Sequence, residues 1–115
     1  EKIQTIKELR TKGYRVVMLS NTNDGHWTTI EKRFFNASGE SLENCFDALY
    51  LSYRMHRRKP ESEIFLELMS SEGVTPDECI FYDDSAENCE AARSLGIDAV
   101  QFERNSSWGS AFDAF

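Results

Sequence analysis

A pattern of helix followed by strand, repeated four times, is the strongest constraint on the fold of this 115-residue chain. Apolar residues recur at helical spacing in these helical segments, and a short apolar run of strand character follows each of them. The predicted helices cover residues 1–12, 26–36, 60–72 and 85–95, and the predicted strands cover residues 15–19, 46–53, 79–82 and 99–102. This alternation is typical of a parallel sheet with helices on both faces. We therefore predict an α/β fold with a three-layer, Rossmann-like parallel sheet.

Glycine and proline mark the borders of the predicted helices. Gly13, Gly73 and Gly96 stand where the helical patterns stop, and Pro60 suits the first turn of the third helix. The preceding loop, residues 53–60, carries a cluster of basic residues: Arg54, His56, Arg57, Arg58 and Lys59. The final residues, 105–115, form a tail whose aromatic side chains are expected to pack on the body of the domain.

Composition limits the chain to one domain, residues 1–115, and to a few classes of partner. The hydrophobic fraction of 40% is enough for one core. The net charge of -7 argues against a general nucleic-acid binder or a binder of anionic membranes. Because the sequence has neither a long apolar run nor a signal-peptide pattern, we expect a cytoplasmic protein. Cys45, Cys79 and Cys89 lack metal-ligand spacing and are expected to be buried, reduced thiols.

Two adjacent carboxylates, Asp83 and Asp84, follow the apolar run at residues 79–82 directly. We interpret this run as a buried strand that delivers negative charge to the end of the sheet. A buried, unpaired carboxylate costs several kcal/mol and two adjacent carboxylates repel each other, so a cation is expected beside them. The simpler alternative is that Asp84 or Ser85 only caps the next helix.

Polar residues follow three of the predicted strands. Ser20 and Asn21 follow the first strand, Lys59 lies beyond the second, and Asp83 and Asp84 follow the third. In a parallel sheet these strand ends lie on the same edge, where open α/β sheets bind ligands. A hydroxyl with backbone N–H groups, an ammonium group and a metal-binding acid pair can together hold a phosphate dianion. The sequence therefore predicts a phosphate and metal site at this edge.

Each of these residues has a simpler explanation when it is taken alone. Ser20 would be a turn residue, and Lys59 would be a solvated lysine. His26 and His56 are expected to lie at the surface or to support other residues, because neither has an Asp, Glu or His at a recognised metal spacing. The combination of residues, and no single member, indicates the site.

The segments that carry these residues resemble motifs of the haloacid dehalogenase-like hydrolase superfamily. Residues 16–21 are similar to the second motif of the family, residues 59–60 to the third and residues 81–85 to the fourth, in the family's chain order. Residues 58–65 and 83–97 are most similar to small-capped members, which include sugar-phosphate phosphatases. The resemblance covers nearly the whole chain.

The resemblance implies Mg²⁺-dependent hydrolysis of a phosphate monoester, such as a small sugar phosphate or a similar metabolite. The Ser20 hydroxyl and the backbone N–H of Asn21 would bind the phosphoryl oxygens, and Lys59 would bridge the phosphate and the nucleophile. Asp84 would be the direct Mg²⁺ ligand. Asp83 would support the metal or pair with Lys59.

The chain departs from the family pattern in two respects. The family's nucleophile is an aspartate in an Asp-x-Asp motif on a first strand, and no Asp-x-Asp occurs in this sequence. The helical cap of small-capped members is also missing. We therefore expect the C-terminal part of a longer enzyme, inactive by itself. By the resemblance, the missing strand lies between the strands that end at Leu19 and Tyr82, so these two should be too far apart to hydrogen-bond.

Other classes of protein remain open alternatives. A receiver-type signalling module uses the same residue types, but its acid pair comes first and its lysine last, whereas the order here is Ser20, Lys59, then Asp83 and Asp84. A binding or regulatory protein of the same fold would need no nucleophile. Ser20 and Asn21 would also suit a haloacid dehalogenase, but the carboxylate pair favours phosphate chemistry with a metal.

Overall fold

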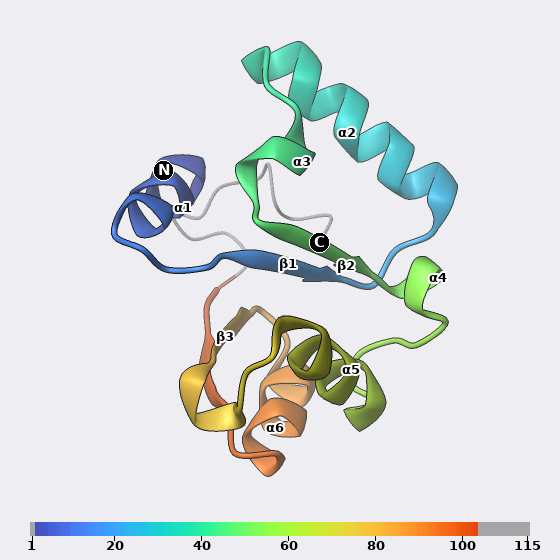
Figure 1. Ribbon diagram of the computed structural model, residues 1–115. Coiled ribbons are helices and arrows are strands. Elements are labelled where there is room, and N and C mark those ends of the chain that lie inside the picture. Colours follow the sequence, from blue (N-terminus) through green and yellow to red (C-terminus); the bar gives the residue numbers. More distant parts are fainter. Residues whose placement is uncertain (1, 104–115) are drawn as a thin grey trace.

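The computed structural model describes residues 2–103. The described elements alternate between helix and strand for most of the chain, which confirms the predicted α/β fold (Figure 1). In chain order they are α1 (Lys2–Thr11), β1 (Val17–Ser20), α2 (Asp24–Ser38), α3 (Leu42–Cys45), β2 (Ala48–Leu51), α4 (Ser52–Met55), α5 (Ser62–Glu72), the 3₁₀ turn η1 (Pro76–Glu78), β3 (Ile80–Asp83), α6 (Ala86–Ser94) and β4 (Asp98–Gln101). The predicted tail, residues 105–115, lies outside the described residues.

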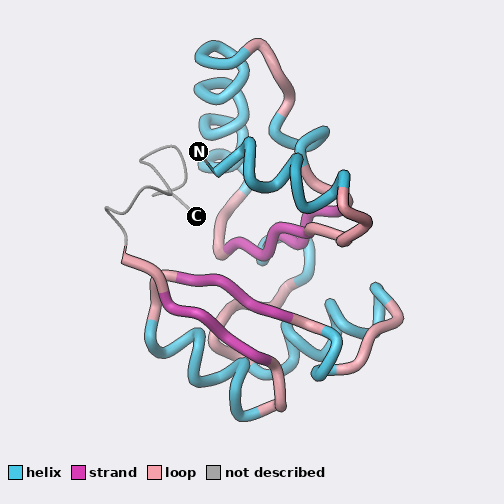
Figure 2. Tube along the Cα trace, turned by 90° about the vertical axis from the view of Figure 1, so that its left-hand side faces the viewer, coloured by secondary structure: helices cyan, strands magenta, loops and turns pink. Residues whose placement is uncertain are grey.

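The four strands form two separate parallel pairs. In the first pair Ser20 of β1 lies opposite Leu51 of β2, and in the second Asp83 of β3 lies opposite Gln101 of β4. Within residues 2–103, β1 and β3 do not pair with each other, as predicted, and Figure 2 shows the two pairs apart. One edge of β1 and one edge of β3 therefore have no strand partner among the described residues.

Helices lie on both sides of β1, which gives the three layers predicted from the sequence. Met18 belongs to one buried cluster, which α1, α2 and α3 share with the first strand pair. Leu19, the next residue, packs against the second cluster, which is built on α5 and α6. Neighbouring side chains of a strand point to opposite faces, so β1 lies between the two helical layers. Figure 1 shows α1, α2 and α3 on one side of β1 and β2, and α5 on the other.

The prediction that β3 is a buried strand is wrong. Phe81 packs against Phe65 of α5 with its ring edge-on, at a centroid distance of 5.2 Å, and Asp83 on the same face is buried. Ile80 and Tyr82 point to the other face and are 61% and 50% exposed. Among the described residues, helices cover this strand pair on one face only. The prediction failed because a continuous apolar sequence, such as that of β3, is typical of a strand buried on both faces.

Two predicted boundaries near the second strand also differ from the structure. The strand was expected to run to residue 53, but the chain turns at Ser52 into α4, because the Ser52 hydroxyl hydrogen-bonds to the backbone of Thr22. Pro60 was expected inside the third helix, but α5 begins two residues later. A tight turn closed by Arg58 and Glu61 occupies this position, with the Glu61 N–H donating to the Arg58 carbonyl at 2.9 Å.

Helix ends follow the local sequence signals. Helix α2 begins at Asp24, two residues before the predicted start, because the side chain of the preceding Asn23 accepts a hydrogen bond from the His26 N–H at 2.8 Å. Ser85 caps α6 in the same way, through the N–H of Asn88. Gly73 ends α5 at a φ of 69°, in the left-handed region that glycine tolerates best.

The cysteines agree only in part with the prediction. Cys45, Cys79 and Cys89 are free thiols, but only Cys45 and Cys89 are buried. Burial raises the pKa of all three thiols, which keeps them protonated near neutral pH. No helix among residues 2–103 is both long and apolar enough to cross a membrane.

Candidate functional site

The structure brings together three of the segments that the sequence singled out. Ser20 is the last residue of β1, Asp83 is the last residue of β3, and Lys59 lies in the loop before α5. The side chain of Asn21 reaches the backbone of Lys59, and the ammonium group of Lys59 reaches Asp83. These contacts place the predicted site residues at the carboxyl ends of β1 and β3.

Lys59 and Asp83 form a buried ion pair. The Nζ of Lys59 lies 2.6 Å from Oδ2 of Asp83, and the two side chains are 3% and 7% exposed. The other carboxylate oxygen, Oδ1, accepts a hydrogen bond from the Ser85 N–H at 2.8 Å. The Lys59 ammonium also lies 5.7 Å from the ring centroid of Phe81. Asp83 thus makes the contact with Lys59 that was one of its two predicted roles.

Ser20 is fully buried and its hydroxyl has no hydrogen-bond partner among the described residues. A buried hydroxyl without a partner loses the hydrogen bonds that water would give it, so such groups are rare in folded proteins. A hydroxyl can donate one hydrogen bond and accept others. Ser20 is therefore suited to bind a ligand oxygen at the end of β1.

Asp84 follows β3 directly and is half-buried, with its backbone carbonyl accepting from the side chain of Gln101. Within the described range, no group of three or more His, Cys, Asp or Glu residues is arranged to hold a metal ion. At this edge Asp83 and Asp84 provide two adjacent carboxylates. This donor set fits Mg²⁺, which keeps several water ligands and needs only one or two protein carboxylates.

The basic loop beside the site exposes its charged side chains. Arg54, His56, Arg57 and Arg58 are exposed, whereas Lys59 at the end of the same run is buried. His26 at the start of α2 is also exposed. Both histidines thus lie at the surface, as expected.

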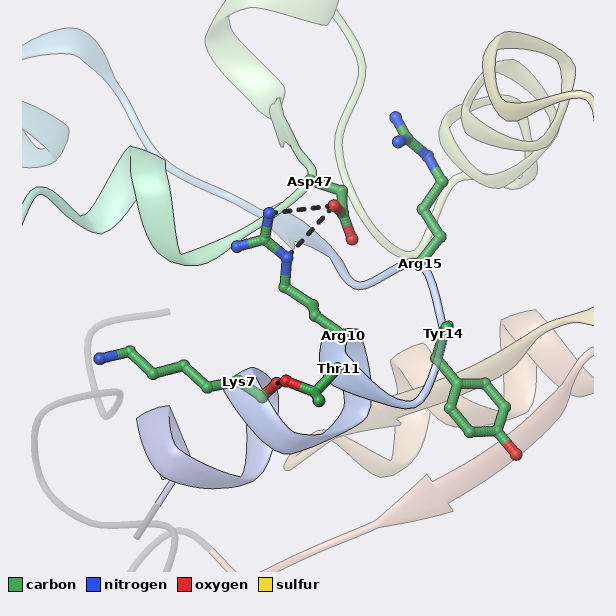
Figure 3. A pocket seen from close by; sticks show the side chains of 7 residues that line it. Lys7, Arg10, Thr11, Tyr14, Arg15 and Asp47 are labelled. Atoms are coloured by element: carbon green, nitrogen blue, oxygen red, sulfur yellow. Dashed lines mark hydrogen bonds and ion pairs between the residues drawn. The ribbon is translucent and has the colours of Figure 1, made fainter.

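The cavity drawn in Figure 3 lies elsewhere, at the opposite edge of the sheet. It has a volume of about 570 Å³ and is lined by residues that precede β1 and β2, among them Arg15 and Asp47. Its cations are already paired. Arg10 contacts Asp47, as Figure 3 shows, and Arg15 contacts Glu72. We therefore assign no catalytic role to this cavity.

Two residues near the site were missed in the sequence analysis. Ser52, directly after β2, bonds to the backbone of Thr22, and its position at the carboxyl end of a strand was the available signal. Asn88, in the first turn of α6, places its side-chain amide 3.4 Å from both carboxylate oxygens of Asp83. No sequence signal distinguished Asn88 from an ordinary residue of a helical first turn.

The chain is similar in sequence and in structure to several known proteins. The D-ribitol-5-phosphate phosphatase of Bacteroides thetaiotaomicron is 36% identical over 107 residues, which are 93% of this chain and 52% of that protein. A fructose-1-phosphate phosphatase of Escherichia coli is 34% identical over 59 residues, 51% of this chain and 31% of its own length. The crystal structure of a HAD family enzyme from Bacteroides thetaiotaomicron, in complex with magnesium and inorganic phosphate, superposes with a TM-score of 0.85 at 40% identity.

That structure is matched over 96% of this chain and 56% of its own chain, so the present chain spans about half the length of these relatives. The model of the haloacid dehalogenase-like hydrolase family matches residues 2–96, which include every candidate site residue. The match confirms the family that the sequence resembles, and the superposed structure confirms its fold. The chain belongs to the haloacid dehalogenase-like hydrolases.

Proposed function

We propose that this chain is part of the core domain of a Mg²⁺-dependent hydrolase of phosphate monoesters. The observation that carries the proposal is the buried hydroxyl of Ser20, which has no hydrogen-bond partner among the described residues and lies at the same edge as the buried Lys59–Asp83 pair. Relatives named as phosphatases of ribitol phosphate and fructose phosphate support a small sugar or polyol phosphate as the substrate. The net charge of -7 disfavours a nucleic-acid partner, and the cytoplasm remains the proposed location.

Each residue has a role that follows from its chemistry. The Ser20 hydroxyl and the backbone N–H of Asn21 donate hydrogen bonds to phosphoryl oxygens. Lys59 places a positive charge where negative charge develops in the transition state, at a site shielded from water. Asp84, with Asp83 beside it, would hold Mg²⁺. The metal, when bound, supplies a Lewis acid that polarises a phosphoryl oxygen.

The nucleophile is proposed to come from a segment outside residues 1–115. Covalent phosphoryl transfer needs a carboxylate nucleophile and an acid that protonates the leaving group. Asp83 cannot take the first role, because both of its carboxylate oxygens already bind Lys59 and the N–H of Ser85. An Asp-x-Asp strand beside β1 and β3 would supply both groups and would pair with the edges of these strands that have no strand partner within residues 2–103.

Release of inorganic phosphate by the full-length protein tests the proposal. We expect turnover of ribitol 5-phosphate or fructose 1-phosphate in the presence of Mg²⁺, and its loss after chelation with EDTA. Ser20→Ala should lower turnover, whereas Ser38→Ala, at an exposed position in α2, should not. Binding of phosphate without any turnover would instead favour a binding protein of the same fold. Turnover of a 2-haloacid in place of phosphate esters would favour a dehalogenase.

A further inference from the structure

The side chain of Asn21 forms a two-way amide contact with the backbone of Lys59. Its Nδ2 donates to the Lys59 carbonyl at 3.0 Å, and its Oδ1 accepts from the Lys59 N–H at 2.8 Å. These bonds join residues 38 positions apart in the sequence. Both the donor and the acceptor of the backbone unit of Lys59 are therefore held by one side chain.

This contact needs the chemistry of a carboxamide. Asn carries an acceptor oxygen and an NH₂ donor on the same planar group, whereas ionised Asp only accepts hydrogen bonds. In an Asn21→Asp variant the Lys59 carbonyl would face a carboxylate oxygen instead of a donor. Ala would leave both backbone groups of Lys59 without this partner. Neither replacement can reproduce the contact.

A second two-way contact, between Ser52 and Thr22, holds the loop that follows β1. The Ser52 hydroxyl accepts from the Thr22 N–H at 2.8 Å and donates to the Thr22 carbonyl at 2.9 Å. Asn21 and Thr22 are thereby fixed between the end of β2 and the Lys59 loop. Because Ser20 precedes them directly, the candidate phosphate-binding hydroxyl and the Lys59 backbone are connected through one short, doubly fixed segment.

We propose that the side chain of Asn21 is a positioning residue that sets the location of the Lys59 ammonium relative to Ser20. This inference deepens the proposed function and rests on it. Lys59 Nζ lies at hydrogen-bond distance from Asp83, so its backbone must be placed correctly for the ammonium to reach the site. Misplacement of a catalytic group by about 1 Å lowers turnover by about 100-fold. Loss of the Asn21 contact lowers turnover because it displaces the Lys59 ammonium.

A double-mutant cycle in the full-length protein tests whether Asn21 acts through Lys59. Asn21→Ala should lower kcat by about tenfold to 100-fold in the wild-type background. In the Lys59→Met background the same change should lower kcat by less than about threefold, because the ammonium that Asn21 positions is gone. Asn36→Ala, at an exposed position of α2, is the matched control. An equal loss in both backgrounds would show that Asn21 acts independently of Lys59.

Hydrogen exchange at the Lys59 amide tests the contact without relying on turnover. Asn21→Ala and Asn21→Asp should accelerate exchange of the Lys59 N–H by about tenfold or more, with the core amide of Met69 unchanged. Ser52→Ala should accelerate exchange at Thr22 and leave Lys59 protected. Unchanged protection of Lys59 in both Asn21 variants would overturn the inference. If the wild-type protein hydrolyses no phosphate ester, the proposed function fails. The exchange measurement still shows whether Asn21 holds the backbone of Lys59.

Discussion

The Nζ of Lys59 lies 2.6 Å from Oδ2 of Asp83, and this buried ion pair connects the loop before α5 to the end of β3. At the other end of the sheet, Glu72 of α5 binds both Arg15 and the Tyr50 hydroxyl of β2. Polar contacts thus fasten α5 to β2 at one end and to β3 at the other. The Lys59–Asp83 pair lies at the carboxyl ends of the strands, where Ser20 ends β1, whereas Arg15, which Glu72 contacts, precedes β1.

Replacement of Lys59 by Met should lower both stability and turnover. The change leaves Asp83 as a buried carboxylate without its cation, which costs about 3–5 kcal/mol of unfolding free energy. Loss of one preorganised charge at the phosphate should lower kcat by about 100-fold to 1,000-fold. Denaturant unfolding and steady-state kinetics of the full-length protein measure the two effects.

The two effects of the lysine can be separated by a second substitution. In a Lys59→Met and Asp83→Asn double variant the buried negative charge is removed, so most of the stability should return while turnover stays low. Lys32→Met, at an exposed position of α2, is the control and should change neither quantity. Full turnover by Lys59→Met would show that Lys59 has no catalytic role.

Ser20→Ala should separate ligand binding from folding. Because the Ser20 hydroxyl has no protein partner among the described residues, its removal should change the unfolding free energy by less than about 1 kcal/mol. Affinity for inorganic phosphate should fall, since one donor to the anion is lost. Thermal unfolding and calorimetric titration with phosphate measure the two quantities. A large loss of stability with normal phosphate affinity would mean that Ser20 is a packing residue.

The two carboxylates after β3 should respond differently to neutral replacement. Asp83 is bound to Lys59 and to the Ser85 N–H, so Asp83→Asn should mainly lower kcat. Asp84→Asn should raise the Mg²⁺ concentration needed for half-maximal turnover, by about tenfold or more. Titration of turnover with Mg²⁺ distinguishes them. Unaltered metal dependence in Asp84→Asn would refute its assignment as a ligand.

Tyr50 should make stability depend on pH in the alkaline range. Burial, together with the hydrogen bond to Glu72, raises its pKa from 10.0 to about 12. The folded state then keeps a proton that the unfolded state loses, so this contribution is full below pH 10 and disappears as the pH rises toward 12. Between these values the unfolding free energy of the wild-type protein should fall more steeply than that of Tyr50→Phe. Tyr14→Phe, at an exposed phenol, should retain the wild-type slope.

The sequence was most informative where local chemistry decides the structure. Helical spacing predicted the helix at residues 26–36, which lies within α2, and the apolar side chains of Trp27 and Ile30 in it are buried. The rule that parallel strand ends share an edge brought Lys59 and Asp83 together correctly. The rule succeeded because both residues lie near the end of a strand or the start of a helix. At such positions a small error in a predicted boundary does not move a residue to the opposite edge of the sheet.

Long-range contacts account for most of the wrong or missed details. The strand before Asp83 was expected to be buried, but exposure of Ile80 and Tyr82 depends on which elements lie above them, and a strand's own sequence does not encode this. The turn at Ser52 depends on a hydrogen bond to Thr22, 30 residues away. The two-way contact between Asn21 and Lys59 is also invisible to local patterns, because it requires two loops to meet.

The most direct test of the central claim is a crystal structure of the full-length protein with Mg²⁺ and inorganic phosphate. We expect phosphate oxygens within about 3.2 Å of both the Ser20 hydroxyl and the Lys59 ammonium, with the metal bound to Asp84. Phosphate bound at another surface, such as the cavity of Figure 3, with these two groups in contact with protein alone, would contradict the account.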